Sequence, residues 1–223
     1  MLAATLINPM IPVLKLTDTV GTALDWMDEF RTKQLIIAEA GVYKGIVSED
    51  ILFDISDTTE PLGRIIIQHK DIFAVEDQHP YELLRLVNQF GLLIIPVVNE
   101  DRTLIGSILV SDLIENFVNE LGVQEKGAVI VLKIAEKDYS LSEISRLIES
   151  NGTKILSTYY SSSESAHPVH ESKLTLKLNR THITPIIATL ERFGYEIEEA
   201  HANDPIESVD QERLDMLLRY LAT

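Results

Sequence analysis

Two short stretches of the sequence place serine and aspartate side chains shortly after a glycine and a short apolar run. The first stretch is Gly45–Leu52. The second is Gly106–Leu113, whose glycine lies 61 residues further along the chain. Hydroxyl and carboxylate groups hydrogen-bond polar ligands, and glycine lets another backbone approach closely because it has no Cβ. The same groups written twice indicate two related places where a polar small molecule could bind.

The parts that precede each glycine also occur twice and in the same order. Leu16–Asp18 corresponds to Val75–Asp77, a helical stretch follows in both copies, and the apolar run Leu35–Ile37 corresponds to Ile94–Val98. We therefore expect two repeats with the order strand, helix, strand, strand, helix. Repeats of this kind pair because one copy cannot bury its apolar face alone, and the cleft between them is a natural place for a ligand.

The patterns also place the individual strands and helices. Continuous apolar runs predict buried strands, and a serine before a helical stretch predicts an N-cap. Core spacing in the first helix predicts that Trp26 is buried. The expected strands are Gln34–Ala38, Val42–Val47, Leu92–Val98 and Leu104–Leu109, and the expected N-caps of the helices that follow are Ser48 and Ser111.

This arrangement resembles a tandem pair of cystathionine-β-synthase (CBS) domains, a regulatory module that commonly binds adenosine-containing ligands. The usual signature is an apolar strand with Pro-Val, then a glycine, two apolar residues, Ser or Thr, two free positions and Asp. In that signature the hydroxyl can contact a phosphate or sugar, and the aspartate accepts two ribose hydroxyls at a helix N-terminus. The resemblance implies an adenosine-type ligand (adenosine, AMP or S-adenosylmethionine) and the following site residues: Gly45, Ser48, Asp50, Pro96, Gly106 and Asp112.

Each copy departs from the signature at a different position. In the first copy Ser48 holds the hydroxyl position, but Asp50 arrives one residue early and the proline is missing. In the second copy Pro96 and Asp112 are in register, but Leu109 replaces the hydroxyl. The second copy is therefore the better ribose site and the first the better phosphate site. The alternative is that both aspartates only cap helices.

From Gly127 the pattern changes to that of a different domain. The order strand, helix, strand, strand, helix, strand over residues 127–202 predicts a ferredoxin-like βαββαβ domain. Ser140 and Glu143 have the spacing of a capping box. Thr184 opens the second helix, in which Ile187, Leu190 and Phe193 are expected to face inward. The expected strands are Ala128–Ala135, Lys154–Tyr160, Lys173–Asn179 and Tyr195–Ala200.

This domain resembles an ACT domain, a module that commonly binds amino acids at an interface between two copies. ACT domains usually carry Pro-Gly in the loop after the first strand, whereas the loop here is Lys137–Ser140 and contains no glycine. We therefore expect a structural, dimer-forming role. The whole order of domains resembles that of the bacterial acetoin-utilisation regulatory proteins. Residues 208–222 have the pattern of an amphipathic helix.

Composition and charge narrow the classes of partner. The formal net charge is −16 and no basic run occurs, so we expect no binding to nucleic acid. No apolar run approaches roughly 18 residues, and no basic residue precedes the apolar N-terminus. The chain also contains no cysteine. We expect a cytoplasmic protein that does not bind membranes, for which a neutral or cationic ligand fits better than ATP.

No residue pattern indicates catalysis or a metal centre. The two histidines of His167–His170 share a serine-rich loop without further ligands nearby, and there is no Gly-x-Ser-x-Gly motif or glycine-rich phosphate loop. We therefore predict that the chain is not an enzyme and holds no metal. Divalent-cation sensing by carboxylates fits the charge, but no ligand spacing supports it.

The sequence thus predicts an α+β chain: a tandem CBS-type pair, a ferredoxin-like ACT-type domain and a C-terminal helix. The expected boundaries are residues 1–60 and 61–122 for the repeats, 127–202 for the ACT-like domain and 203–223 for the helix. The predicted function is that of a homodimeric regulatory protein that senses an adenosine-containing small molecule between the repeats. The alternative is a scaffold protein with degenerate ligand sites.

Overall fold

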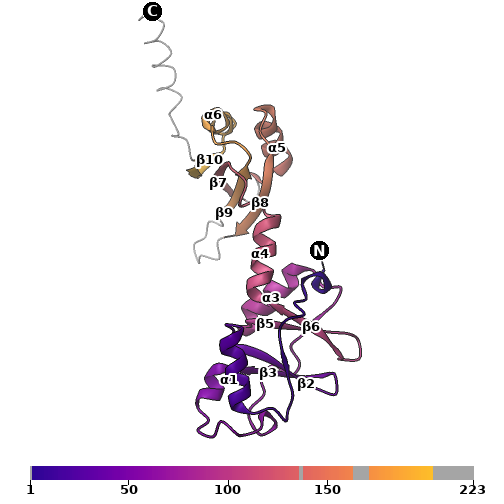
Figure 1. Cartoon of the computed structure of the whole chain (residues 1–223). Coiled ribbons are helices and arrows are strands. Elements are labelled where there is room, and N and C mark those ends of the chain that lie inside the picture. The colour runs from indigo at the N-terminus through magenta and orange to yellow at the C-terminus, as the bar shows by residue number, and fades with distance from the viewer. Residues whose placement is uncertain (1, 136–137, 163–170, 203–223) are drawn as a thin grey trace, which may run out of the picture. The chain divides into compact units, whose positions relative to one another are not determined.

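The computed structural model describes residues 2–135, 138–162 and 171–202. The chain divides into two compact units, Met1–Phe117 and Val118–Thr223, and each has its own hydrophobic core. Both units combine helices with small sheets, which confirms the expected α+β class (Figure 1). The His167–His170 segment and the predicted C-terminal helix lie outside the described residues.

The first unit contains two copies of the predicted order strand, helix, strand, strand, helix. In each copy the first strand pairs parallel with the second, and the second pairs antiparallel with the third. The first copy consists of β1 (Val13–Leu14), α1 (Val20–Glu29), β2 (Gln34–Glu39), β3 (Val42–Ser48) and α2 (Glu49–Phe53). The second consists of β4 (Ala74–Val75), α3 (Pro80–Phe90), β5 (Ile94–Val98), β6 (Leu104–Leu109) and α4 (Val110–Glu120).

Local sequence sets the ends of several of these elements. Pro80 opens α3, where a missing N–H costs nothing, and Gly91 ends it with φ at 63°. The β2–β3 hairpin turns at Ala40 and Gly41, which both have positive φ. Two-residue turns of this handedness match the natural twist of paired strands.

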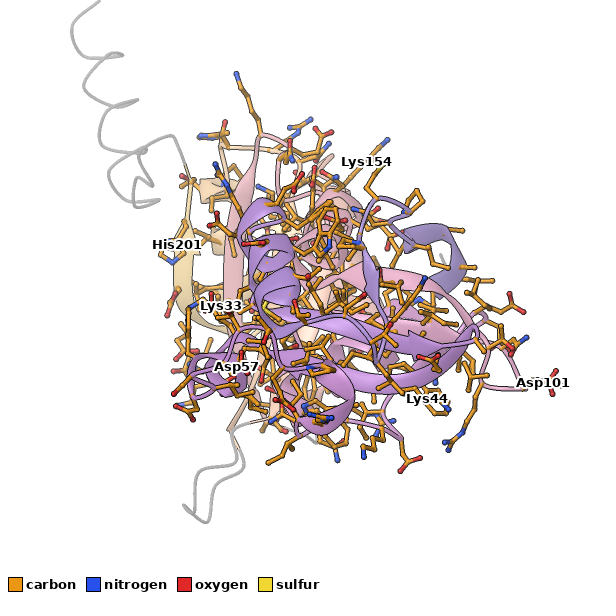
Figure 2. All side chains as sticks on the ribbon, turned by 60° about the horizontal axis from the view of Figure 1, so that its bottom comes forward. Lys33, Lys44, Asp57, Asp101, Lys154 and His201 are labelled. Carbon is orange, nitrogen blue, oxygen red and sulfur yellow. The ribbon has the colours of Figure 1, made fainter. Side chains whose placement is uncertain are left out.

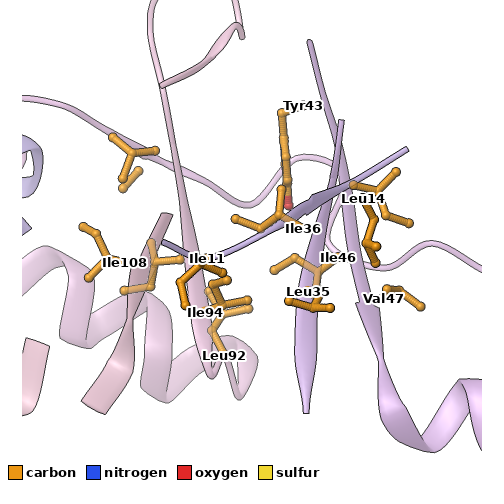
Figure 3. Packing of buried hydrophobic residues seen from close by; sticks show 14 of the residues in the cluster. Ile11, Leu14, Leu35, Ile36, Tyr43, Ile46, Val47, Leu92, Ile94 and Ile108 are labelled. Atoms are coloured by element: carbon orange, nitrogen blue, oxygen red, sulfur yellow. The ribbon is translucent and has the colours of Figure 1, made fainter. Parts of the chain in front are cut away.

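The middle strands of the two sheets, β2 and β5, lie at the centre of one shared core. Every residue of β5 is buried, and so are five of the six residues of β2. Apolar runs without alternation are typical of strands covered on both faces. Side chains of both copies lie in one cluster (Figure 3), among them Leu35, Ile36, Ile46, Leu92, Ile94 and Ile108.

A buried glutamine links the two copies. Gln34 begins β2 and is 9% exposed. Its Nε2 donates to the Gly91 carbonyl at 3.3 Å, and its Oε1 accepts from the Leu93 N–H at 2.7 Å. Both partners belong to the loop between α3 and β5. One amide therefore satisfies two backbone groups of the other copy, which would be costly to leave unpaired when buried.

The segment that leads into each copy packs on the other copy. We name these stretches the N-terminal segment (residues 2–8) and the linker segment (residues 61–68). Each contains a short 3-10 helix, η1 (Ala3–Leu6) in the first and η2 (Leu62–Arg64) in the second.

Backbone hydrogen bonds hold each of these segments on the other copy. The Asn8 N–H of the N-terminal segment donates to the Ser107 carbonyl on β6 at 2.8 Å. The Gln68 N–H of the linker segment donates to the Ile46 carbonyl on β3 at 2.9 Å. Each third strand is therefore covered by chain that precedes the other repeat.

The second unit is a four-stranded antiparallel sheet with two helices packed into its core. The strand order is β10-β7-β9-β8, and the element order is the predicted βαββαβ. Leu174, Leu176 and Leu178 alternate into the core. The elements are β7 (Ala128–Ala135), α5 (Leu141–Ser150), β8 (Ile155–Ser162), β9 (Glu171–Leu178), α6 (Thr184–Arg192) and β10 (Glu196–His201).

Two predicted helix caps differ in the structure. Ser111 lies inside α4, because β6 runs directly into a helix that begins at Val110. Ser140 forms no side-chain cap on α5, and Glu143 accepts a hydrogen bond from the Tyr195 hydroxyl at 3.0 Å instead. Burial and this hydrogen bond raise the pKa of Tyr195 to about 12. The capping-box prediction was therefore wrong.

Two aromatic residues that were predicted to face the cores are exposed. Trp26 on α1 is 36% exposed, and Phe193 is 47% exposed. Phe193 follows the last residue of α6, so its side chain no longer keeps the helical spacing. Ile186 and Leu190 face the core of the second unit in its place.

Replacing Gln34 with methionine should destabilise the first unit by about 2 kcal/mol. The substitution keeps the side-chain volume but leaves the Gly91 carbonyl and the Leu93 N–H without a partner. Urea denaturation of the full chain, followed by fluorescence of its single tryptophan, Trp26, reports on this unit. Gln89→Met, at an exposed position of α3, is the matched control and should change stability by less than about 0.5 kcal/mol. An equal loss at both positions would contradict the role of Gln34.

Candidate functional site

The candidate residues of the first copy gather where β3 meets α2. Gly45 has φ at 138°, and a Cβ there would collide with the Ile67 side chain and the Gln68 carbonyl. Ser48 is 6% exposed and donates its hydroxyl hydrogen to Gln68 Oε1 at 3.0 Å. Ser48 is the N-cap residue of α2, as predicted, but its side chain makes no capping hydrogen bond. The linker segment thus engages both the glycine and the hydroxyl.

Asp50 lies in the first turn of α2 with its side chain exposed. Hydrogen bonding to the Ser48 hydroxyl, and then to the backbone N–H groups of Ile51 and Asp50 itself, holds the pKa of the Asp50 carboxyl below its ordinary value. A serine has one hydrogen, so Asp50 and Gln68 compete for it. The backbone contacts are those of a carboxylate that stabilises a helix start.

In the second copy the candidate carboxylate faces the N-terminal segment. Asp112 is half-buried in the first turn of α4. Its Oδ2 accepts from Asn8 Nδ2 at 2.9 Å, and its Oδ1 accepts from Ser111 Oγ at 3.3 Å. Both donors are side chains rather than backbone N–H groups of the helix start. This geometry differs from the helix-cap arrangement of Asp50.

Gly106 and Pro96 lie where the N-terminal segment crosses the second copy. A Cβ at Gly106 would collide with the Ile7 side chain, so the glycine lets Ile7 pack against β6. Pro96 is buried in β5, in register with Ser107. The Ser107 carbonyl accepts the Asn8 N–H. These residues fix the backbone from which the Asn8 side chain extends.

The two groups of residues are related by the repeat but have opposite hydrogen-bonding polarity. In the first group the amide oxygen of Gln68 accepts from Ser48. In the second group the amide nitrogen of Asn8 donates to Asp112. Each amide follows an isoleucine that packs over the glycine of its group. In each copy, the in-register polar side chain of the signature, Ser48 or Asp112, therefore bonds an amide from the segment that leads into the other copy.

Sequence reasoning did not identify Asn8 and Gln68. A signal was present, because Ile7-Asn8 and Ile67-Gln68 stand 60 residues apart, close to the spacing of the two glycines. The match is only two residues long and has no helical or strand periodicity. It becomes recognisable once the structure shows which strand each segment crosses.

Neither a metal centre nor a membrane span is found in the parts of the chain that the structure describes. No three His, Asp or Glu side chains among those residues are placed to hold an ion together. No helix built from them is long and apolar enough to cross a bilayer. The cation-sensing hypothesis therefore has no ligand set within residues 2–135, 138–162 and 171–202.

Comparison with protein families gives a match over the second copy. Residues 63–119 match the CBS domain family. The matched range begins in the linker segment, ends in α4 and contains Pro96, Gly106 and Asp112. The resemblance that the repeats predicted is thereby confirmed for the part of the chain that carries the better-preserved signature.

A solved structure also shows the fold of the first unit. A CBS domain pair/ACT domain protein from Thermotoga maritima is 22% identical at a TM-score of 0.50, and the match covers 53% of this chain and 98% of that one. At this identity the likeness shows the fold alone, which for the first unit is a CBS-type pair. A protein assigned to acetoin utilization (AcuB) from Vibrio cholerae is 22% identical at a TM-score of 0.48, over 56% of this chain and 95% of that one. CBSX2 in complex with AMP is 19% identical at a TM-score of 0.47, over 53% and 96%.

Gly45→Ala should destabilise the first unit by about 2 kcal/mol or more, and Gly106→Ala by about half as much. At Gly45 the added methyl group meets a backbone carbonyl and the residue needs positive φ, whereas at Gly106 it meets only the Ile7 side chain. Urea denaturation followed by Trp26 fluorescence measures both losses.

Truncation of the isoleucine that packs over each glycine distinguishes a clash with a side chain from a clash with the backbone. In the Ile7→Ala background, Gly106→Ala should lower the free energy of unfolding only slightly, because the Ile7 side chain was the only group that the new methyl group would meet. Relative to Ile67→Ala alone, Gly45→Ala should keep most of its cost, because the Gln68 carbonyl remains. Full rescue at both positions would show that backbone approach is not the reason for the first glycine.

Proposed function

We propose that the chain is a non-enzymatic regulatory protein that senses an adenosine-containing small molecule at its CBS-type pair. The observation that carries this proposal is the Asp112 carboxylate, which lies in the first turn of α4 within the range that matches the CBS domain. CBS domains commonly bind adenosine-type ligands. A carboxylate offers about four lone-pair positions, so the bonds from Asn8 and Ser111 leave capacity for two ribose hydroxyls.

Charge favours a neutral or cationic ligand such as adenosine or S-adenosylmethionine. The formal net charge is −16, and exposed carboxylates such as Asp57 and Asp101 project from the first unit (Figure 2). Leu109 stands where a hydroxyl would contact a phosphate. Lys33 lies near the candidate residues of the first copy, but its ammonium group already pairs with the Glu49 carboxylate at 3.4 Å. A phosphate would therefore find little compensation for its charge.

A scaffold role without a ligand is the second candidate, and the first copy favours it. There the buried Ser48 hydroxyl donates to Gln68 and also interacts with Asp50, which in turn interacts with its own helix start. A copy arranged in this way has little left to offer a phosphate. The two candidates differ in one respect: a sensor needs a ligand with different affinity for two states of the protein, whereas a scaffold needs none.

Adenosine and S-adenosylmethionine at about 1 mM should raise the unfolding temperature of the first unit, and AMP should do so less. A ligand at 100 times its Kd stabilises the native state by about 2.7 kcal/mol, which corresponds to about 10 °C for a unit of this size. Thermal unfolding followed by Trp26 fluorescence measures the shift. A complete lack of stabilisation by all three compounds would contradict the proposed function.

Asp112→Ala should sharply reduce this stabilisation while the protein stays folded. Glu115→Ala is the matched control, since it removes an exposed carboxylate from the same helix and should keep the response. Circular dichroism of both variants checks the fold. An undiminished response in Asp112→Ala would place the ligand elsewhere.

The proposed assembly is a homodimer formed through both units. Phe53 on α2 and Ile114 on α4 are 69% and 50% exposed, and the 61-residue offset makes them equivalent in the two copies. Large exposed apolar side chains at equivalent positions of the two copies favour a surface that another subunit covers. In the second unit Tyr159 and Tyr160 are exposed on β8, an edge strand without charge or proline to block pairing.

The double substitution Phe53→Asp with Ile114→Asp should raise the dimer dissociation constant at least about tenfold, because two charges would be buried at the interface. Light scattering across a dilution series measures the mass against that of one chain, 25.1 kDa. Ser56→Asp, at an exposed loop position after α2, is the control and should leave the dimer unchanged. A wild-type chain that is monomeric at about 100 μM would contradict this assembly.

A further inference from the structure

Asn8 reaches Asp112 from outside the matched CBS domain. The two residues are 104 positions apart in sequence, and Asn8 lies in the N-terminal segment, which precedes the first repeat. The distance from Asn8 Nδ2 to Asp112 Oδ2 is 2.9 Å. A neutral amide donor thus contacts the carboxylate on which the proposed ribose recognition depends.

The orientation of this amide is fixed by its other contacts. Asn8 Oδ1 accepts the Met10 N–H at 3.0 Å, and the Asn8 N–H donates to the Ser107 carbonyl at 2.8 Å. An amide whose oxygen is held by an N–H donor must turn its NH2 group the other way. The donor therefore faces Asp112 before any ligand arrives.

We propose that Asn8 is a positioning residue that sets Asp112 for recognition of a vicinal diol. This inference rests on the proposed function. By holding one carboxylate oxygen, the amide fixes the plane of the carboxylate, so the remaining lone pairs are already directed when the two hydroxyls of a ribose arrive. Preorganised groups bind with less ordering cost than free rotors. The expected consequence is selectivity for ribose over 2′-deoxyribose.

The first copy lacks this arrangement, so the selectivity belongs to the second copy alone. Ile51 stands at the position equivalent to Asp112. Gln68 presents its oxygen rather than its nitrogen and accepts the hydrogen of Ser48. The chain is therefore expected to bind one nucleoside per protomer.

Isothermal titration of the full chain with adenosine and 2′-deoxyadenosine tests the proposal. The wild type should bind one adenosine per chain, about tenfold tighter than the deoxy compound. Asn8→Leu keeps the shape of the side chain without the donor, and should weaken adenosine binding about tenfold while hardly changing that of 2′-deoxyadenosine. Asn88→Leu, an exposed amide on α3, is the matched control and should keep the wild-type ratio.

Two further variants test whether Asn8 acts through Asp112. Asn8→Asp keeps the acceptor for the Met10 N–H but places a carboxylate against Asp112, and should weaken adenosine binding at least as much as leucine does. In an Asp112→Ala background, which should already lack selectivity, Asn8→Leu should cause no further change. Independent losses that add in the double variant would overturn the proposal.

The outcomes distinguish a failure of the proposed function from a failure of the role assigned to Asn8. If the wild type binds neither nucleoside, the proposed function fails and takes this inference with it. If the wild type prefers adenosine and the Asn8 variants keep that preference, the inference alone fails. Loss of both nucleosides by the same factor would mark Asn8 as structural and would also overturn it.

Discussion

The first unit depends on the close approach of each leading segment to the outer strand of the other repeat. At Gly45 the carbonyl of Gln68 lies 2.5 Å from the place where a Cβ would stand, and at Gly106 the Ile7 side chain fills the equivalent space. Backbone hydrogen bonds and packing both follow from this approach. The glycines therefore matter first for how the repeats cover one another, and a ligand would meet surfaces that are already built by that contact.

The same exchange explains how the two copies could diverge in chemistry without losing their packing. A polar group that is buried or half-buried needs a partner, and an amide can serve as either donor or acceptor. Ser48 in one copy needs an acceptor, and Asp112 in the other needs a donor. Gln68 and Asn8 meet these opposite needs from equivalent positions. The repeats are therefore alike in backbone and different in what they can offer a ligand.

Much of the fold could be predicted because burial leaves a direct pattern in the sequence. The strands Leu104–Leu109 and Ala128–Ala135 have the expected bounds, since their apolar spacing is set by the cores that they enter. Helix starts were less predictable. The N-cap predicted at Ser111 failed because β6 passes into α4 without a loop, and the capping box failed because Glu143 finds Tyr195, 52 residues away.

The candidate site could be predicted only in part, because the partners of its side chains lie far away in the sequence. Its signature side chains lie at helix starts that sequence spacing locates. Their partners come from 20 residues away for Ser48 and 104 for Asp112. Such partners depend on which segment crosses which strand, and segments without periodicity give no sign of it. The carboxylate was therefore identifiable from sequence, whereas the amide that orients it was not.

The reciprocal covering of the two repeats bears on how such a chain could arise. A single ancestral repeat would have an exposed outer strand. Only a second molecule could supply the segment that packs on this strand, and that contact would weaken as the protein is diluted. Duplication within one gene places donor and acceptor on the same tether, where the local concentration of the missing piece is high and constant. On this view, fusion made an intermolecular contact intramolecular. The site residues of each repeat could then diverge without loss of that contact.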